Sequence, residues 1–197
     1  MFILDAEDFR NSRLTLSLIF LNILFYITFN LSFPDDYLLA LVQINSRIIQ
    51  DFELWRLITA MFLHSDILHL FSNLLALLIF GAFIESNKNF NKIQFLIIYI
   101  ISGLIGNLFS LVLLPINSIS LGASGAIFGL IGAAFLVIIT QARPLLIFAI
   151  AYILYFLVGS FSPGINLWAH LFGLMGGILL GYLLTYEKLL ERHTYYE

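Results

Sequence analysis

The sequence predicts an all-α, polytopic membrane protein: a bundle of six transmembrane helices with a long, interfacial first loop. Of its 197 residues, 61% are hydrophobic and only 11% are charged, and the mean hydropathy is +1.00. Soluble domains carry about 25% charged residues, so this composition indicates a chain that lies largely in lipid. Six apolar segments approach the length of about 20 residues that crosses a bilayer. We expect them to form one membrane domain over residues 1–197.

The six predicted spans follow one another with short breaks after the second. They are 14–33, 66–85, 93–114, 122–140, 145–161 and 165–186. The later breaks contain Asn, Ser, Pro or Gly, which favour turns, and the fourth and fifth spans are only just long enough to cross. A short N-terminal segment, 1–13, precedes the first span, and a polar tail, 187–197, follows the last.

The first connection, 34–65, is long and mixes apolar clusters with charged residues, and no stretch of it is apolar for long enough to cross. This alternation is typical of short amphipathic helices that lie in the membrane interface. Trp55 beside Arg56 suits an anchor at the level of the lipid headgroups.

The distribution of positive charge predicts the orientation. An even number of spans puts both termini on one side, and seven of the nine Lys and Arg residues fall on that side. Only Arg47 and Arg56 fall opposite. The positive-inside rule therefore makes both termini cytoplasmic. If the source is a prokaryote, the membrane is the cell membrane.

Charge and cysteine content exclude several classes. A net charge of −3 gives no sign of nucleic-acid binding, and the absence of cysteine excludes disulfides and thiolate ligands or nucleophiles. Three histidines are predicted near the outer side, but no carboxylate joins them at a ligand-like spacing. We therefore expect no metal site and no cofactor.

Two motifs place reactive side chains inside apolar segments: Gly122-Ala123-Ser124-Gly125 and the run from Ala169-His170 to Gly173. Polar groups at membrane depth are costly, so they are functional candidates. The topology places Ser124, His170, His69 and Asn73 at a similar depth below the outer surface. Each has an alternative interpretation, because a lone serine or glycine serves helix packing and a lone histidine can bond a neighbouring carbonyl.

Taken together, these residues resemble the rhomboid family of intramembrane serine proteases. The resemblance covers nearly the whole chain, from the first span to the sixth. The motifs that carry it are the pair Trp55-Arg56; His64, His69 and Asn73; Gly81 with Glu85; Gly122, Ser124 and Gly125 with Phe128 one turn on; and Ala169-His170 with Gly173 and Gly177. The family often has tyrosine at the position of Phe128, which keeps the ring but lacks the hydroxyl.

The resemblance implies a role for each residue. Ser124 is the nucleophile and His170 its base, since a serine hydroxyl needs one, and no carboxylate in the motif makes this a triad. His69, Asn73 and the Ser124 N–H are the oxyanion donors, and Phe128 stacks on the imidazole. The remaining motif residues support the site, with Gly122 and Gly125 allowing close backbone approach. By analogy the fifth span is the gate for substrates, which are transmembrane segments of other proteins.

Other functions remain as alternatives. The sequence has no His-Glu-x-x-His run for a zinc protease, no Gly-x-Gly-Asp of an aspartyl protease, and no internal symmetry of a transporter. The strongest rival is an inactive rhomboid-like protein that binds client transmembrane helices. Such relatives typically lose the serine or the histidine, whereas this chain keeps both.

Overall fold

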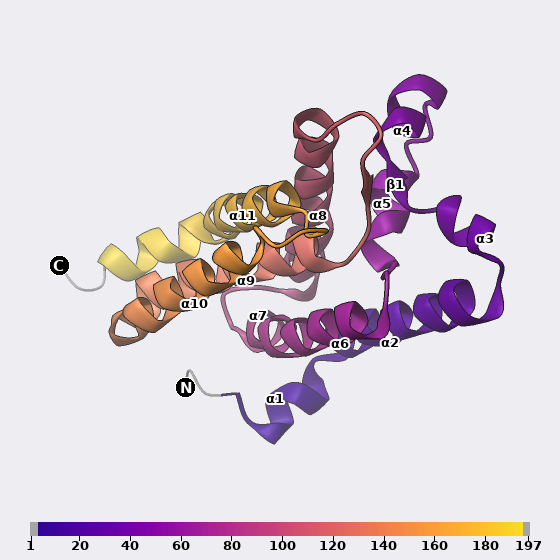
Figure 1. Ribbon diagram of the computed structural model, residues 1–197. Helices are drawn as coiled ribbons and strands as arrows, with labels where there is room; N and C mark the ends of the chain where they lie inside the picture. The colour runs from indigo at the N-terminus through magenta and orange to yellow at the C-terminus, as the bar shows by residue number, and fades with distance from the viewer. Residues whose placement is uncertain (1–3, 195–197) are drawn as a thin grey trace.

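The computed structural model describes residues 4–194, with side chains described as far as residue 186. Its architecture is helical (Figure 1), and five helices are long and apolar enough to cross a membrane. These five run over Arg13–Ser32, Ile67–Ser86, Lys92–Leu113, Ser124–Gln141 and Leu167–Tyr186.

Several of these helices are composite. The first joins α2 (Arg13–Tyr26) to the π-helix η1 (Ile27–Ser32), and the second joins α6 (Ile67–Ala76), the π-helix η3 (Leu77–Gly81) and α7 (Ala82–Ser86). The others are α8 (Lys92–Leu113), α9 (Ser124–Gln141) and α11 (Leu167–Thr194). Helix α11 continues into the segment 187–197, which the sequence analysis describes as a polar tail.

The predicted fifth span, 145–161, is shorter than the others. The turn η4 (Arg143–Leu145) leads into α10 (Leu146–Gly159), and none of the residues of α10 is buried. Together they cover Arg143–Gly159, which at about 1.5 Å per residue falls short of a hydrocarbon layer of about 30 Å. Helix α10 therefore lies at the periphery of the bundle.

The first loop contains short helices, as the sequence predicts, and a small strand pairing that the all-α prediction lacks. Its elements are α3 (Asp35–Leu39), β1 (Gln43–Ile44), α4 (Asn45–Asp51), α5 (Arg56–Thr59) and the turn η2 (Ala60–Phe62). Strand β1 pairs antiparallel with β2 (Ile119–Ser120), Gln43 opposite Ser120. This pairing fastens the loop to the segment that leads into α9.

Arg56 is buried inside the loop and does not point to the lipid headgroups. Its Nη1 donates to the carbonyls of Leu39 at 2.6 Å and Val42 at 2.7 Å, and its Nε pairs with Glu53. Trp55 remains half exposed, with its indole N–H 3.4 Å from the Ala40 carbonyl. Arg56 therefore holds the loop in shape from within, while Trp55 lies at its surface.

Glu85 and Gly81 dock the second span on the first. The Glu85 carboxylate accepts bonds from the backbone N–H groups of Leu14 at 2.9 Å and Thr15 at 2.8 Å, and from the Thr15 hydroxyl at 2.9 Å. The first N–H groups of a helix lack intrahelical acceptors, and a negative charge there complements the helix dipole. A Cβ on Gly81 would lie 2.7 Å from Thr15 Cγ2, so glycine permits this approach.

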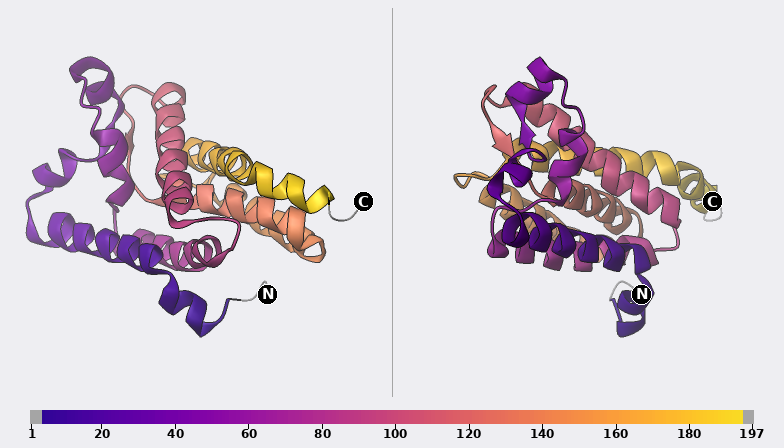
Figure 2. Two further views of the ribbon diagram at one scale, coloured as in Figure 1. Left: turned by 180° about the vertical axis from the view of Figure 1, so that it is seen from behind. Right: turned by 90° about the vertical axis from the view of Figure 1, so that its right-hand side faces the viewer.

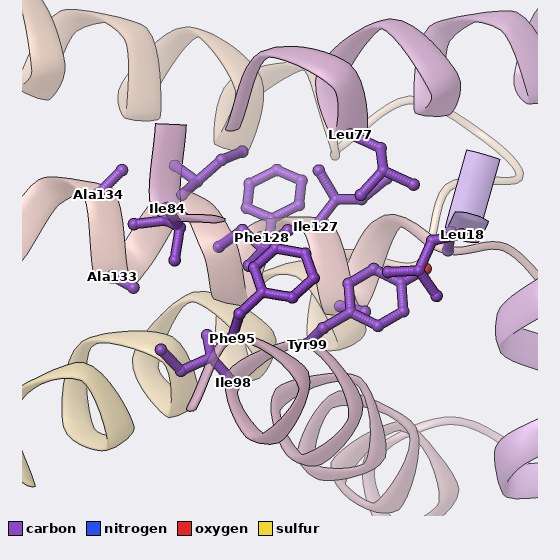
Figure 3. Close-up of a cluster of buried hydrophobic side chains, with 14 of the residues drawn as sticks. Leu18, Leu77, Ile84, Phe95, Ile98, Tyr99, Ile127, Phe128, Ala133 and Ala134 are labelled. Carbon is purple, nitrogen blue, oxygen red and sulfur yellow. The ribbon is translucent and has the colours of Figure 1, made fainter. Parts of the chain in front are cut away.

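Helices α9 and α11 lie in backbone contact. A Cβ on Gly173 would lie 2.2 Å from the Gly125 carbonyl oxygen, and one on Gly177 would lie 1.8 Å from that of Gly129. Small residues four apart bring membrane helices this close. The other face of α9 enters the hydrophobic core, where Ile127 and Phe128 lie among side chains of the second and third spans (Figure 3). Helix α9 is thus enclosed on both sides.

The two ends of the bundle differ. Helix α1 (Ala6–Asn11) and the last turns of α11 lie at one end, and α3, α4 and β1 lie at the other (Figure 2). Helix α1 is closed by a capping box in which Asp5 and Asp8 each accept a backbone N–H. The first loop therefore covers the end of the bundle where α9 and α11 begin.

The Gly177→Ala substitution should destabilise the protein, because its Cβ would clash with the backbone of Gly129. Backbone atoms cannot move aside as the end of a flexible side chain can. We expect a loss of about 1–3 kcal/mol and a lower midpoint in thermal unfolding of the purified protein in detergent. Gly181→Ala is the matched control, since its Cβ would lie 3.4 Å from Ala133. Equal unfolding midpoints for the two variants would contradict the backbone contact.

Candidate active site

Ser124 and His170 meet at the loop-covered end of the bundle. Ser124 is the first residue of α9, and His170 lies in the first turn of α11. The distance from His170 Nε2 to Ser124 Oγ is 2.7 Å. The imidazole is 8% exposed and the serine is half-buried. The contact that the sequence analysis expects between these two residues is present.

The turn before Ser124 depends on glycine. Gly122 has a φ of +129°, which L side chains rarely adopt, and its N–H donates to the Ala60 carbonyl at 2.9 Å. A Cβ on Gly122 would also lie 2.9 Å from His69 Nε2 and 3.7 Å from Ser124 Oγ. The turn therefore brings the serine and the His69 ring to the same small space.

Two neighbours, one aromatic and one polar, fix the orientation of the His170 ring. Phe128, one turn along α9 from Ser124, stacks on it with ring centroids 4.3 Å apart and an interplanar angle of 15°. On the opposite ring edge, His170 Nδ1 lies 2.7 Å from the hydroxyl of Ser160, a buried residue at the C-terminus of α10. Nothing in the sequence singles out Ser160, because a serine at a helix end usually only caps it.

Asn166 holds the start of α11, and it too was missed. Its Oδ1 accepts from the Ala169 N–H at 3.0 Å, as an N-cap does, and its Nδ2 donates to Ser110 at 2.9 Å and Ser120 at 3.0 Å. One amide thus ties α11 to α8 and to strand β2. An Asn three residues before the start of the Ala169-His170 motif is the signal that could have found this cap.

His69 and Asn73 lie one turn apart on α6, which contacts α9. The His69 backbone N–H donates to Asp66 Oδ1 at 2.9 Å, and its Nδ1 is 3.1 Å from the Ser65 hydroxyl. The bond from the His69 N–H, followed by one from the Ser65 hydroxyl to Asp66 Oδ2 at 2.7 Å, holds the pKa of the Asp66 carboxyl below its ordinary value. Asn73 Nδ2 is buried and has no acceptor among the described residues, so one strong donor stands unused.

His64 is fully buried, and neither ring nitrogen has a partner in the described part of the chain. Its ring meets the His69 ring edge-on, with centroids 5.0 Å apart, and its carbonyl accepts from Asn30 at 2.9 Å. Burial, followed by repulsion from His69, lowers the pKa of His64 to about 3. The carbonyl, not the imidazole, ties the end of the loop to η1.

The described side chains contain no group of three or more His, Cys, Asp or Glu residues placed to hold a metal ion. The structure instead brings together a hydroxyl and an imidazole at hydrogen-bond distance, and α6 carries an amide donor that has no acceptor among the described residues. This set can move a proton from an alcohol and stabilise a negative oxygen.

Comparisons with known proteins point to one family. A family model described as "Rhomboid domain" matches residues 51–187, more than half of the chain. The chain is 36% identical over 143 residues to YdcA of Bacillus subtilis (strain 168), a candidate rhomboid protease, and the match covers 69% of this chain and 70% of YdcA.

Relatives from eukaryotes match as well. RHOMBOID-like protein 6, mitochondrial, of Arabidopsis thaliana is 35% identical over 153 residues, which cover 77% of this chain and 49% of that protein. Rhomboid-like protease 3 of Toxoplasma gondii is 34% identical over 151 residues, which cover 72% of this chain and 55% of that protein. The chain thus spans about half the length of these two relatives.

His64 should make the protein sensitive to acid. Its pKa is about 3 when folded and 6.5 ordinarily, so between these values the unfolded state binds a proton that the folded state does not. The stability that this group contributes is complete above pH 6.5 and falls as the pH drops. We expect a loss of about 2 kcal/mol from pH 7 to pH 5.

Thermal unfolding midpoints at pH 7 and pH 5, compared between the parent and His64→Met, test this expectation. The variant keeps the other histidines and fills the same buried space, so its midpoint should fall less. Parallel losses in the two proteins would show that His64 does not carry the effect.

Proposed function

This chain belongs to the rhomboid family, and we propose that it is an intramembrane serine endopeptidase that cleaves transmembrane segments of other membrane proteins. The observation that carries the proposal is the 2.7 Å contact between His170 Nε2 and Ser124 Oγ. A serine hydroxyl is a weak nucleophile until a base accepts its proton. An inactive relative has no need of this contact.

In the proposed reaction, Ser124 Oγ attacks the scissile carbonyl while His170 Nε2 takes its proton. The tetrahedral intermediate collapses when the imidazolium returns that proton to the leaving amine, which leaves an acyl-enzyme. Water then repeats the sequence and frees the serine. Stacking of Phe128 supports the proposal, because it holds the ring in the plane that both transfers need.

The oxyanion of the intermediate needs donors that are already in place. We assign this role to the Ser124 N–H, to Asn73 Nδ2 and to His69 Nε2. The N–H groups at the start of α9 lack intrahelical acceptors, and the Asn73 amide is buried without a partner among the described residues. Ser65 donates its one hydroxyl hydrogen to Asp66 Oδ2 at 2.7 Å, so its oxygen accepts the bond from His69 Nδ1 at 3.1 Å. His69 Nε2 therefore donates to the oxyanion only when the ring is protonated at both nitrogens.

Helix α10 is the proposed entry for substrates. It has no buried residue, and Tyr152 meets Phe80 of η3 with ring centroids 5.3 Å apart. Parting of this aromatic contact would open a path from lipid between α10 and the second span. A helical peptide bond is buried in its own hydrogen bonds, so substrates should carry helix-weakening residues near the cut.

The chain is a multi-pass membrane protein, and we propose that both termini are cytoplasmic. Helix α1 and the end of α11 lie at the same end of the bundle (Figure 1), and Lys and Arg gather in the connections on that side. The site at the other end would then open toward the outer face, where water for hydrolysis can enter.

Labelling with a fluorophosphonate probe tests the proposed nucleophile. The parent should be labelled and should cleave a transmembrane substrate, whereas Ser124→Ala should lose both activities. His170→Ala should slow both by roughly 10²–10⁴-fold, the usual contribution of a general base. Ser72→Ala, an exposed serine on α6, is the control. A parent that binds transmembrane helices but is never labelled would instead support the inactive, client-binding function.

Asn73→Ala should lower kcat by roughly 10²–10³-fold, the effect of losing one oxyanion donor, and should leave KM within a few-fold. The amide acts on charge that develops only in the transition state. Steady-state kinetics with a fluorogenic transmembrane substrate in detergent separate the two constants. A raised KM at unchanged kcat would remove Asn73 from the oxyanion site.

A further inference from the structure

Ser160 contacts the edge of the His170 ring that faces away from Ser124. Its Oγ lies 2.7 Å from His170 Nδ1 and 2.8 Å from the carbonyl of Phe156, one turn back on α10. The side chain is 3% exposed, so no solvent competes for these bonds. The imidazole thus has a hydroxyl at each nitrogen, Ser124 at Nε2 and Ser160 at Nδ1.

Counting hydrogens at Ser160 decides which nitrogen carries the ring proton. The Phe156 carbonyl oxygen can only accept, and it also accepts the Ser160 backbone N–H at 3.1 Å. Two oxygens 2.8 Å apart repel unless a hydrogen lies between them, so the one hydrogen of the Ser160 hydroxyl points to this carbonyl. The oxygen of Ser160 must then accept the bond from His170, which places the ring proton on Nδ1. Nε2 is left with a lone pair, and this lone pair faces the Ser124 hydroxyl. The opposite tautomer would leave the 2.8 Å contact to Phe156 without a hydrogen.

We propose that Ser160 is a positioning residue that keeps His170 in the tautomer able to act as a base. The inference rests on the proposed protease function and deepens it, since it adds a third member to the Ser124–His170 pair. A carboxylate does this work in Ser-His-Asp enzymes. Here a neutral hydroxyl does it, whose own orientation is set by the backbone of α10.

A purely structural role predicts different behaviour. A serine that only bonds the carbonyl four residues back slightly bends or caps its helix, and its loss would alter stability and leave the chemistry intact. A positioning role predicts that the rate of the serine reaction falls while substrate affinity and folding stay the same.

Three variants separate these roles: Ser160→Ala removes the hydroxyl, Ser160→Thr keeps it, and Ser162→Ala changes an exposed serine of the same turn. For Ser160→Ala we expect kcat and the fluorophosphonate labelling rate to fall roughly 10-fold, as for loss of one buried hydrogen bond, with KM within two- to three-fold. Ser160→Thr should recover most of the rate, and Ser162→Ala should match the parent.

A second measurement needs no variant of Ser160. Nitrogen-15 NMR of histidine-labelled parent protein, with His170 assigned by its absence in His170→Ala, reports the tautomer directly. We expect the Nδ1–H form, and the Nε2–H form would overturn the inference. Labelling of Ser160→Ala at the parent rate would also overturn it while leaving the protease function standing. A parent that is neither labelled nor active would remove both.

Discussion

The close approach of α9 and α11 is the constraint on which the candidate site depends. A hydrogen bond between side chains on two different helices survives only if the helix separation is fixed to a few tenths of an ångström. Lipid tails are as apolar as leucine, so apolar attraction alone does not bring membrane helices together. Here Gly173 and Gly177 put the backbone of α11 directly against that of α9. Backbone atoms set the distance between the two helices, and unlike side chains they have no alternative rotamers.

The glycines set the distance between α9 and α11 but not their register along the helix axes. Hydrogen bonds at the loop-covered end fix that register. Asn166 joins the start of α11 to Ser110 and Ser120, and the pairing of β1 with β2 joins the first loop to the same segment. Arg56 keeps that loop folded through carbonyls of its own backbone. The site is therefore framed by rigid helices on one side and by a cross-linked loop on the other.

Much of this arrangement could be predicted from the sequence, because its signals are local. Apolar length indicates the spans, and the motifs around Ser124 and His170 indicate the two side chains that meet at the loop-covered end. The inward orientation of Arg56 and the roles of Ser160 and Asn166 were not predictable in this way. Each depends on a partner far away in the chain or on a neighbour that only the packed bundle supplies.

The elements that differ from prediction share a cause as well. Strands β1 and β2 have two residues each, too few for any alternating pattern, and they form because the loop is already held beside α8. Helix α10 covers most of the predicted span 145–161 but ends at Gly159, two residues before its predicted end. The local sequence indicates where such strands and helices can form, and contacts with the rest of the bundle determine how long they are.

In the proposed mechanism, the position of Ser160 at the C-terminal end of α10 links the entry of a substrate past this helix to the tautomer of His170. If a peptide enters past α10, the helix that yields to it is the same helix that presents the hydroxyl to the imidazole. Displacement of α10 would then break the bond between Ser160 and His170 Nδ1, and the bond would form again only when α10 returned. A substrate helix would therefore enter first, α10 would close behind it, and cleavage would follow only then. Helices that contact the entrance without entering would not be cleaved.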